Sequence, residues 1–130
     1  MTEFIHTYTR AEALQDGVLI DVSKMAKEAG HPFPTAVTHR LHERIIPTEA
    51  EKQRLGQSYD GRLWDVLRLA FMAVALKGSL DNLHIPFKMK IHEERNRRPK
   101  HNTIALIFDL SPGDGGLNDP VVTIGFPSDF

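Results

Sequence analysis

Apolar and polar residues alternate in the last third of the chain, beginning at Leu83. Apolar side chains at positions 83, 85, 87, 89 and 91 are separated by His, Pro and Lys, which is the period of a strand with one buried face. The same alternation returns at 104–108 and at 122–126. The connecting segments are rich in charged residues, Gly and Pro, as loops are. The pattern therefore predicts a three-stranded antiparallel β-meander over about 83–126.

The first 77 residues carry the signals of helix starts and stops instead. Two Thr-x-x-Glu segments, at 9–12 and 48–51, have the spacing of a capping box. Pro34 suits the first position of a helix, and apolar residues at 37, 41 and 45 would then form a single stripe. Residues 18–22 are apolar but few, so they form either a small strand or a buried connector.

The strongest helical signal runs from Asp60, a suitable N-cap, to Lys77 and Gly78, which suit a helix end. The second half of this segment, 69–76, is apolar on every side. Such a helix lies in the centre of a core or is covered by a second subunit. We therefore expect a long apolar helix, compatible with a homodimer, with these residues in one core: Trp64, Leu67, Phe71 and Val74.

Helices followed by strands indicate an α+β fold. We expect several short helices and the one long apolar helix, packed on the three-stranded antiparallel meander. A length of 130 residues suits a single globular domain, 1–130, with its helical part at about 9–77.

Composition narrows the classes of function. The formal net charge is −1, so no overall field steers a polyanion toward the protein. The chain contains no Cys, which excludes disulfides, thiolate metal sites and Cys nucleophiles. The longest apolar run is far shorter than the roughly 20 residues that cross a bilayer, and the first residues lack the pattern of a signal peptide. We therefore expect a cytoplasmic protein without membrane contact.

Two blocks of residues carry a resemblance to known sequences. The first block lies within 8–38 and the second within 61–65. The matching residues are Tyr8, Arg10, Ala11, Asp16, Gly17, Val18, Asp21, Val22, Ala29, Gly30, Phe33, Pro34, Ala36, Val37, Thr38, Gly61, Arg62, Leu63, Trp64 and Asp65. With these, the chain resembles an uncharacterised family of small bacterial proteins, a domain of unknown function often encoded on plasmids, phages and other mobile elements. The resemblance implies membership and brings no activity, substrate or cofactor with it.

The polar residues of these blocks could line a cleft for a small ligand or for acid–base chemistry, beside the aromatic ring of Trp64. Alternatively, Arg62 and Asp65 pair one helical turn apart, while the aspartates serve as caps and turn residues. The candidate cleft residues are Tyr8, Arg10, Asp16, Asp21, Arg62 and Asp65.

A basic segment at 88–101 could contact nucleic-acid phosphates without reading sequence. Six cations against Glu93 and Glu94 leave a charge of +4. Lysines also protect an edge strand from aggregation, so a solvated hairpin remains an alternative. The candidate contacts are Lys88, Lys90, Arg95, Arg97, Arg98 and Lys100.

Two further motifs do not support a cofactor or a metal. His39 and His42 are three residues apart, whereas hydrolytic zinc helices place two histidines four apart with a glutamate between them. The Gly-rich segment 111–120 joins two predicted strands, whereas phosphate loops lead into a helix. We expect no cofactor and no metal site.

The sequence leaves the function unknown and three hypotheses open. The leading one is a non-enzymatic accessory or protein-interaction protein of a bacterial mobile element, with a protein partner not yet identified. The second is a weak, sequence-nonspecific nucleic-acid binder that uses the basic hairpin at 88–101. The third is a small-ligand or enzyme site around Tyr8, Arg10, Asp21, Arg62 and Asp65; no catalytic motif favours an enzyme.

Overall fold

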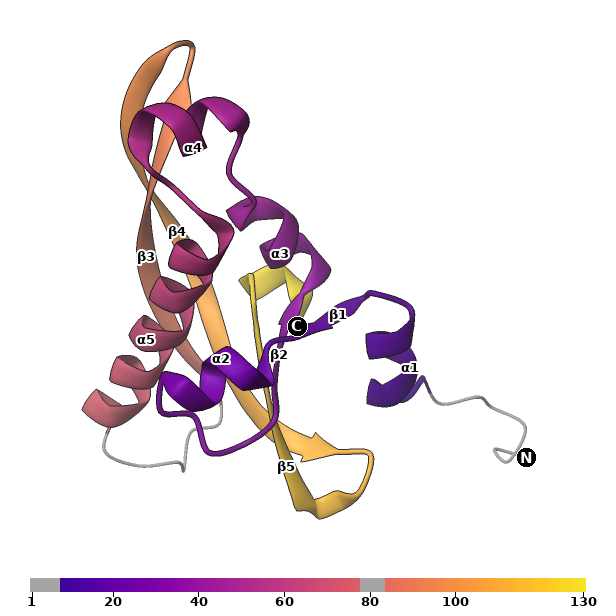
Figure 1. Cartoon of the computed structure of the whole chain (residues 1–130). Coiled ribbons are helices and arrows are strands. Elements are labelled where there is room, and N and C mark those ends of the chain that lie inside the picture. Colours follow the sequence, from indigo (N-terminus) through magenta and orange to yellow (C-terminus); the bar gives the residue numbers. More distant parts are fainter. Residues whose placement is uncertain (1–7, 78–83) are drawn as a thin grey trace.

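A computed structural model describes residues 8–77 and 84–130 (Figure 1). The helices of the described part are α1 (Arg10–Gln15), α2 (Ser23–Glu28), α3 (His39–Ile45), α4 (Glu49–Leu55) and α5 (Tyr59–Lys77), followed near the C-terminus by the 3₁₀ turn η1 (Pro127–Asp129). The strands are β1 (Leu19–Asp21), β2 (Thr35–Thr38), β3 (His84–Arg95), β4 (Arg98–Gly113) and β5 (Gly116–Gly125). These elements confirm the α+β class.

The sheet has five strands in the order β1-β2-β5-β4-β3, so the prediction of a three-stranded antiparallel meander was incomplete. Strand β2 pairs parallel with β5, which makes the sheet mixed. All four residues of β2 are buried, so this strand has no alternation that a period-two search could find. The predicted helix start at Pro34 is wrong for the same reason, because Thr38 caps α3 after the strand has ended.

The predicted loops at 92–101 and 111–120 are largely strand. β3 and β4 pair without interruption from His84↔Asp109 to Arg95↔Arg98. The turn between them consists of Asn96 and Arg97, with φ of 53° and 64°. Two positive φ values in a two-residue loop give the turn whose twist matches that of paired strands. Charged residues therefore extend this hairpin, and the loop prediction was wrong.

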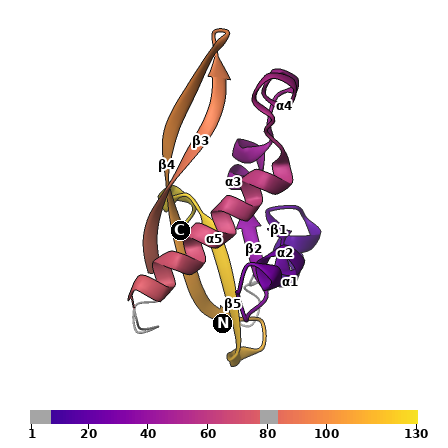
Figure 2. The same cartoon turned by 60° about the vertical axis from the view of Figure 1, so that its left-hand side comes forward.

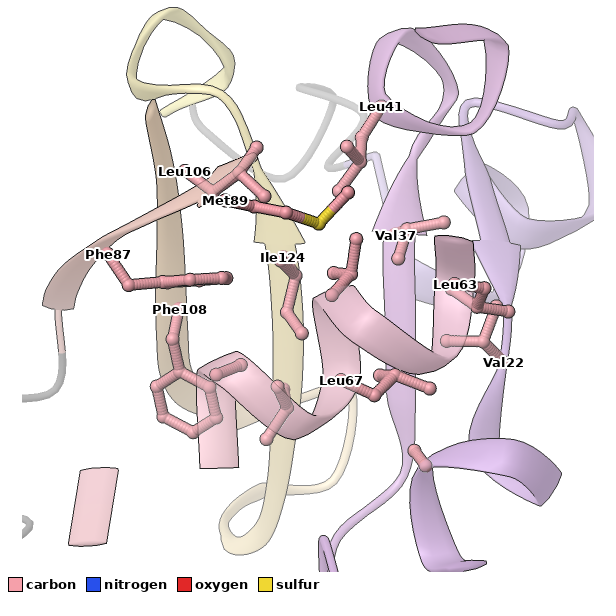
Figure 3. Packing of buried hydrophobic residues seen from close by; sticks show 14 of the residues in the cluster. Val22, Val37, Leu41, Leu63, Leu67, Phe87, Met89, Leu106, Phe108 and Ile124 are labelled. Carbon is pink, nitrogen blue, oxygen red and sulfur yellow. The ribbon is translucent and has the colours of Figure 1, made fainter. Parts of the chain in front are cut away.

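The core lies between one face of the sheet and the helix α5 (Figure 3). The alternating residues of β3 all point into it, as the pattern predicted, and Met89 lies near Leu41 of α3 and Leu106 of β4 (Figure 3). Leu67 of α5 and Ile124 of β5 are fully buried in the same cluster. Burying side chains of this size contributes about 1.5–3 kcal/mol each to folding.

The expected long apolar helix is not found, although α5 is 19 residues long. Its buried residues lie in the first half and at the centre, from Arg62 to Ala70. Met72 and Leu76, in the uniformly apolar half, are 50% and 87% exposed. Trp64 is 39% exposed, so it does not share the core with Leu67 as predicted. An apolar segment does not by itself decide which of its turns meets the sheet, because the partner surface does.

Most of the helix ends were predicted correctly from local sequence motifs. Both capping boxes, at Thr9 and at Thr48, are formed. The start of α5 differs, because the side chain of Ser58, and not that of Asp60, accepts the backbone N–H of Gly61. The predicted helix end at Gly78 and strand start at Leu83 lie outside the described residues. No described helix is both long enough and apolar enough to cross a bilayer.

Candidate nucleic-acid interface

The β3–β4 hairpin forms a long two-stranded ribbon whose turn lies beyond α4, at one end of the molecule (Figures 1 and 2). This ribbon carries all six cations of the predicted basic segment. Each of them is solvent-exposed. The basic hairpin predicted at 88–101 is present, but its strands stay paired up to the two-residue turn Asn96–Arg97, where a longer loop was predicted.

The cations lie on both faces of the ribbon and at its tip. Lys88 and Lys90 alternate with buried residues of β3, so they face away from α5. In the strand register, Lys100 lies directly opposite Glu93 of the other strand. The side chains of directly opposed residues point to the same face of the ribbon. Lys100 therefore lies on the face opposite to Lys88, and Arg97 occupies the turn itself.

The two glutamates near the ribbon tip, Glu93 and Glu94, are engaged by arginines from α3 and α4. Arg44 binds Glu93 through two guanidinium nitrogens, one of them 2.9 Å from Oε2. Asn102 donates to the same Oε2 at 2.7 Å. Although burial alone would raise the pKa of Glu93, these hydrogen bonds and the charge of Arg44 bring it down to about 2. Arg54 of α4 pairs with Glu94 through a single guanidinium nitrogen, and the other carboxylate oxygen of Glu94 has no hydrogen-bond partner among the described residues. Each of the two carboxylates is therefore paired with an arginine from outside the ribbon.

A buried ion pair anchors the free edge of β3. Arg62 of α5 and Glu51 of α4 are both almost fully buried, and their side chains are 3.4 Å apart. Arg62 donates to the carbonyl oxygen of His92 at 2.7 Å, and Glu51 accepts the backbone N–H of Glu94 at 2.9 Å. The pair therefore satisfies two backbone groups that an edge strand would otherwise leave unpaired.

Most of the ribbon cations have no carboxylate partner. Arg95 lies 3.3 Å from Glu93. Within residues 8–77 and 84–130, the other five cations take part in no ion pair: Lys88, Lys90, Arg97, Arg98 and Lys100. Exposed cations without a partner are available to a phosphate at no cost of breaking an existing pair.

The structure does not bring the six residues of the predicted cleft together. Tyr8 donates to Asp16 at 2.7 Å, and this hydrogen bond raises the pKa of Tyr8. Arg10 instead donates to the hydroxyl of Thr123 and the carbonyl of Val122, both in β5. Burial lowers the pKa of Arg10, although nearby carboxylates oppose this. These contacts fasten α1 to the sheet.

Of the other three cleft residues, Asp21 lies near enough to Arg10 for its charge to act on the Arg10 guanidinium, whereas Arg62 and Asp65 belong to α5. Arg62 is the buried anchor of β3, so the predicted pairing of Arg62 with Asp65 is wrong. Asp65 is exposed on α5. Asp21 accepts hydrogen bonds from the backbone and side chain of Ser23 and lines a hollow of about 510 Å³.

That hollow contains a contact that sequence reasoning missed. The Nδ1 nitrogen of His42 lies 2.6 Å from the hydroxyl of Tyr59. Burial raises the pKa of Tyr59, and the charge of Asp60 adds to this. The two rings come from α3 and α5, 17 residues apart, and no local spacing signals such a pair.

The histidines of α3 do not gather ligands for a metal. His39 lies 3.4 Å from Glu43, and His42 is directed at Tyr59. Among residues 8–77 and 84–130, no group of three or more His, Asp or Glu side chains is placed to hold a metal ion.

Comparison with known proteins places the sequence in a family without an assigned function. Residues 1–130 match a family described as "Family of unknown function (DUF6573)". The comparison with curated proteins found no match, and neither did the comparison with solved structures.

Proposed function

This chain belongs to DUF6573, a family of unknown function, and we propose that it is a non-enzymatic protein that binds nucleic acid through the β3–β4 ribbon. The observation that supports this function is the set of five exposed ribbon cations without ion pairs, beside carboxylates that Arg44 and Arg54 already neutralise. Binding is to phosphates and independent of base sequence.

The shape of the ribbon supports a groove as its site on duplex DNA. The major groove is about 12 Å wide and admits a two-stranded β-ribbon. A ribbon in a groove has a phosphate wall on each side, and cations on both of its faces can reach both walls. Lys88 and Lys100, on opposite faces, fit this arrangement. The exposed residues of the ribbon near its tip include no Phe, Tyr or Trp, and the exposed ring of His101 is stacked on that of His92. Stacking on single-stranded bases is therefore not part of the proposal.

Salt dependence of binding tests the proposal. We expect fluorescence anisotropy with a labelled 20-base-pair duplex to show affinity that falls steeply between 25 and 200 mM KCl. Three to five phosphate contacts imply a log–log slope of about −3 to −5. Two duplexes of unrelated sequence should bind within about twofold of each other.

A charge-matched pair of variants separates a specific ribbon contact from an effect of net charge. The double variant Arg97→Glu, Arg98→Glu should weaken binding at least tenfold and reduce the slope by about 2. The control Lys24→Glu, Lys27→Glu changes the net charge equally, at exposed positions of α2, and should change affinity less than threefold. No retention of either duplex by wild-type protein at 25 mM salt would refute the proposal, and so would equal losses in the two double variants.

The wider setting of this function is also a proposal. The resemblance described above supports an accessory role in a bacterial mobile element, in the cytoplasm. The second candidate function is interaction with a protein, a homodimer included, and the exposure of Met72 and Leu76 on α5 favours it. Sedimentation of wild-type protein at high concentration as a single monomeric species would count against the homodimer.

A further inference from the structure

A second cavity lies beneath α5, and its lining is mainly apolar, unlike the cationic ribbon tip. It encloses about 500 Å³, within the range of small-molecule sites. Its wall combines the end of α5, the sheet face and the segment after α2. The lining residues are Gly30, His31, Pro32, Phe33, Phe71, Val74, Ala75, Phe108, Leu110 and Val122.

Among the described residues that line this cavity, only His31 has a polar side chain. It is 5% exposed, and its ring lies between two phenylalanines. The ring of Phe108 stacks at a centroid distance of 6.0 Å, and the ring of Phe71 approaches edge-on at 5.9 Å. A buried polar group in an apolar wall is the feature that fixes the orientation of a small ligand.

The contacts of His31 define what the cavity can recognise. Its Nε2 lies 2.7 Å from the carbonyl oxygen of Leu67. Because a carbonyl only accepts, Nε2 carries the proton and Nδ1 keeps its lone pair. Burial lowers the pKa of His31 and outweighs the hydrogen bond to Leu67, which raises it; the charge of Arg68 lowers it further. A pKa below its ordinary value favours the neutral ring at pH 7. Within the described residues Nδ1 has no hydrogen-bond partner. It is therefore available as an acceptor.

No described residue that lines the cavity has a charged side chain. The guanidinium of Arg68 lies over the ring of Phe71 and already donates to the carbonyl oxygen of Ala29. A charged ligand would lose its hydration in the cavity without a charged lining residue to compensate, so the wall selects against ions. A neutral ligand with an apolar ring loses little hydration free energy on entering the cavity. If it carries one O–H or N–H group, that group can donate a hydrogen bond to Nδ1 of His31.

We infer that this cavity is a binding site for a small, neutral, largely aromatic molecule. The single hydrogen-bond donor of this molecule donates to Nδ1 of His31. The inference is independent of the nucleic-acid proposal, because no ribbon cation lines the cavity.

Three probes of one ring size test the site in the full chain: phenol, toluene and benzoate. We expect phenol and toluene to shift the methyl resonances of Val74 and Leu110 saturably in carbon–proton spectra, and benzoate to leave them unchanged. In His31→Phe, a substitution of similar size between the same two rings, the affinity for phenol should fall about tenfold. The affinity for toluene should stay within twofold, because toluene makes no hydrogen bond to Nδ1 and the contact of Nε2 with the carbonyl oxygen of Leu67 is lost for both probes alike.

A matched pair of tryptophan variants locates the binding. Ala75 is an exposed residue of the cavity wall, and Leu76 is exposed beside it but does not line the cavity. Ala75→Trp should abolish the shifts by both probes, and Leu76→Trp should retain them, while both variants melt like the wild type. The inference is overturned if no probe gives saturable shifts, if Ala75→Trp binds as the wild type does, or if His31→Phe loses phenol and toluene equally.

Discussion

Glu93 offers the sharpest test of the electrostatic arrangement that holds the ribbon. Its folded-state pKa is about 2, against an ordinary value of 4.5. A depressed pKa means that the folded state prefers the carboxylate more strongly than the unfolded state does. The difference of about 2.5 units corresponds to about 3 kcal/mol, since one unit is about 1.4 kcal/mol. That stability is fully present above pH 4.5 and is lost as the pH falls toward 2.

The measurement compares urea unfolding of wild-type protein and Glu93→Gln between pH 7 and pH 2.5. We expect the variant to be less stable by about 2–3 kcal/mol at pH 7, and the difference to shrink progressively below pH 4.5. Glu49→Gln is the control, because Glu49 forms only an exposed ion pair with Lys52, which is worth less than about 1 kcal/mol. A difference between wild type and Glu93→Gln that stays constant from pH 7 to pH 3 would show that ionisation of Glu93 is not its source.

Two further substitutions test the anchor and the core by urea unfolding. Arg62→Ala should cost about 3–5 kcal/mol because it leaves the buried Glu51 without its guanidinium partner. A cost below about 1 kcal/mol would contradict the anchor. Leu67→Ala should lower the free energy of unfolding by about 3 kcal/mol because the residue is fully buried. The control Leu76→Ala should change it by less than about 0.5 kcal/mol. Equal effects of the two substitutions would show that the exposed half of α5 is packed.

The elements that could be predicted from the sequence are those with a local pattern. The strand β3 was predicted from the alternation of Ile85, Phe87, Met89 and Ile91, which one buried face imposes on any such strand. The capping boxes were predicted because their two hydrogen bonds join residues three apart. In both cases the cause lies within a few residues of its effect.

The features that were missed depend on contacts distant in sequence. The short strand β2 is fixed by pairing with β5, whose partner residues lie more than 80 positions later. Arg62 was assigned to Asp65, three residues away, although it pairs with Glu51 on another helix. Sequence spacing alone suggests a partner on the same helix, three or four residues away. Which carboxylate is buried beside the guanidinium is known only from the fold. His31 is another such case, since its cavity is assembled from α5 and strands β4 and β5.

The anchoring of β3 also supports the proposal that the ribbon binds phosphates in a chain of net charge −1. Long-range steering needs net charge, but binding needs only local charge held in place. The screening length is about 8 Å at physiological salt, so acidic residues farther away than this have little electrostatic effect at the ribbon tip. Arg62 and Glu51 hold the edge of β3, and Arg44 removes the nearest uncompensated carboxylate. Because Arg62 and Glu51 hold the backbone of β3, binding of a ligand would require little ordering of that backbone, and the entropy cost would fall on the exposed Lys and Arg side chains. A near-neutral chain can therefore present a local cationic surface, which net charge alone would not reveal.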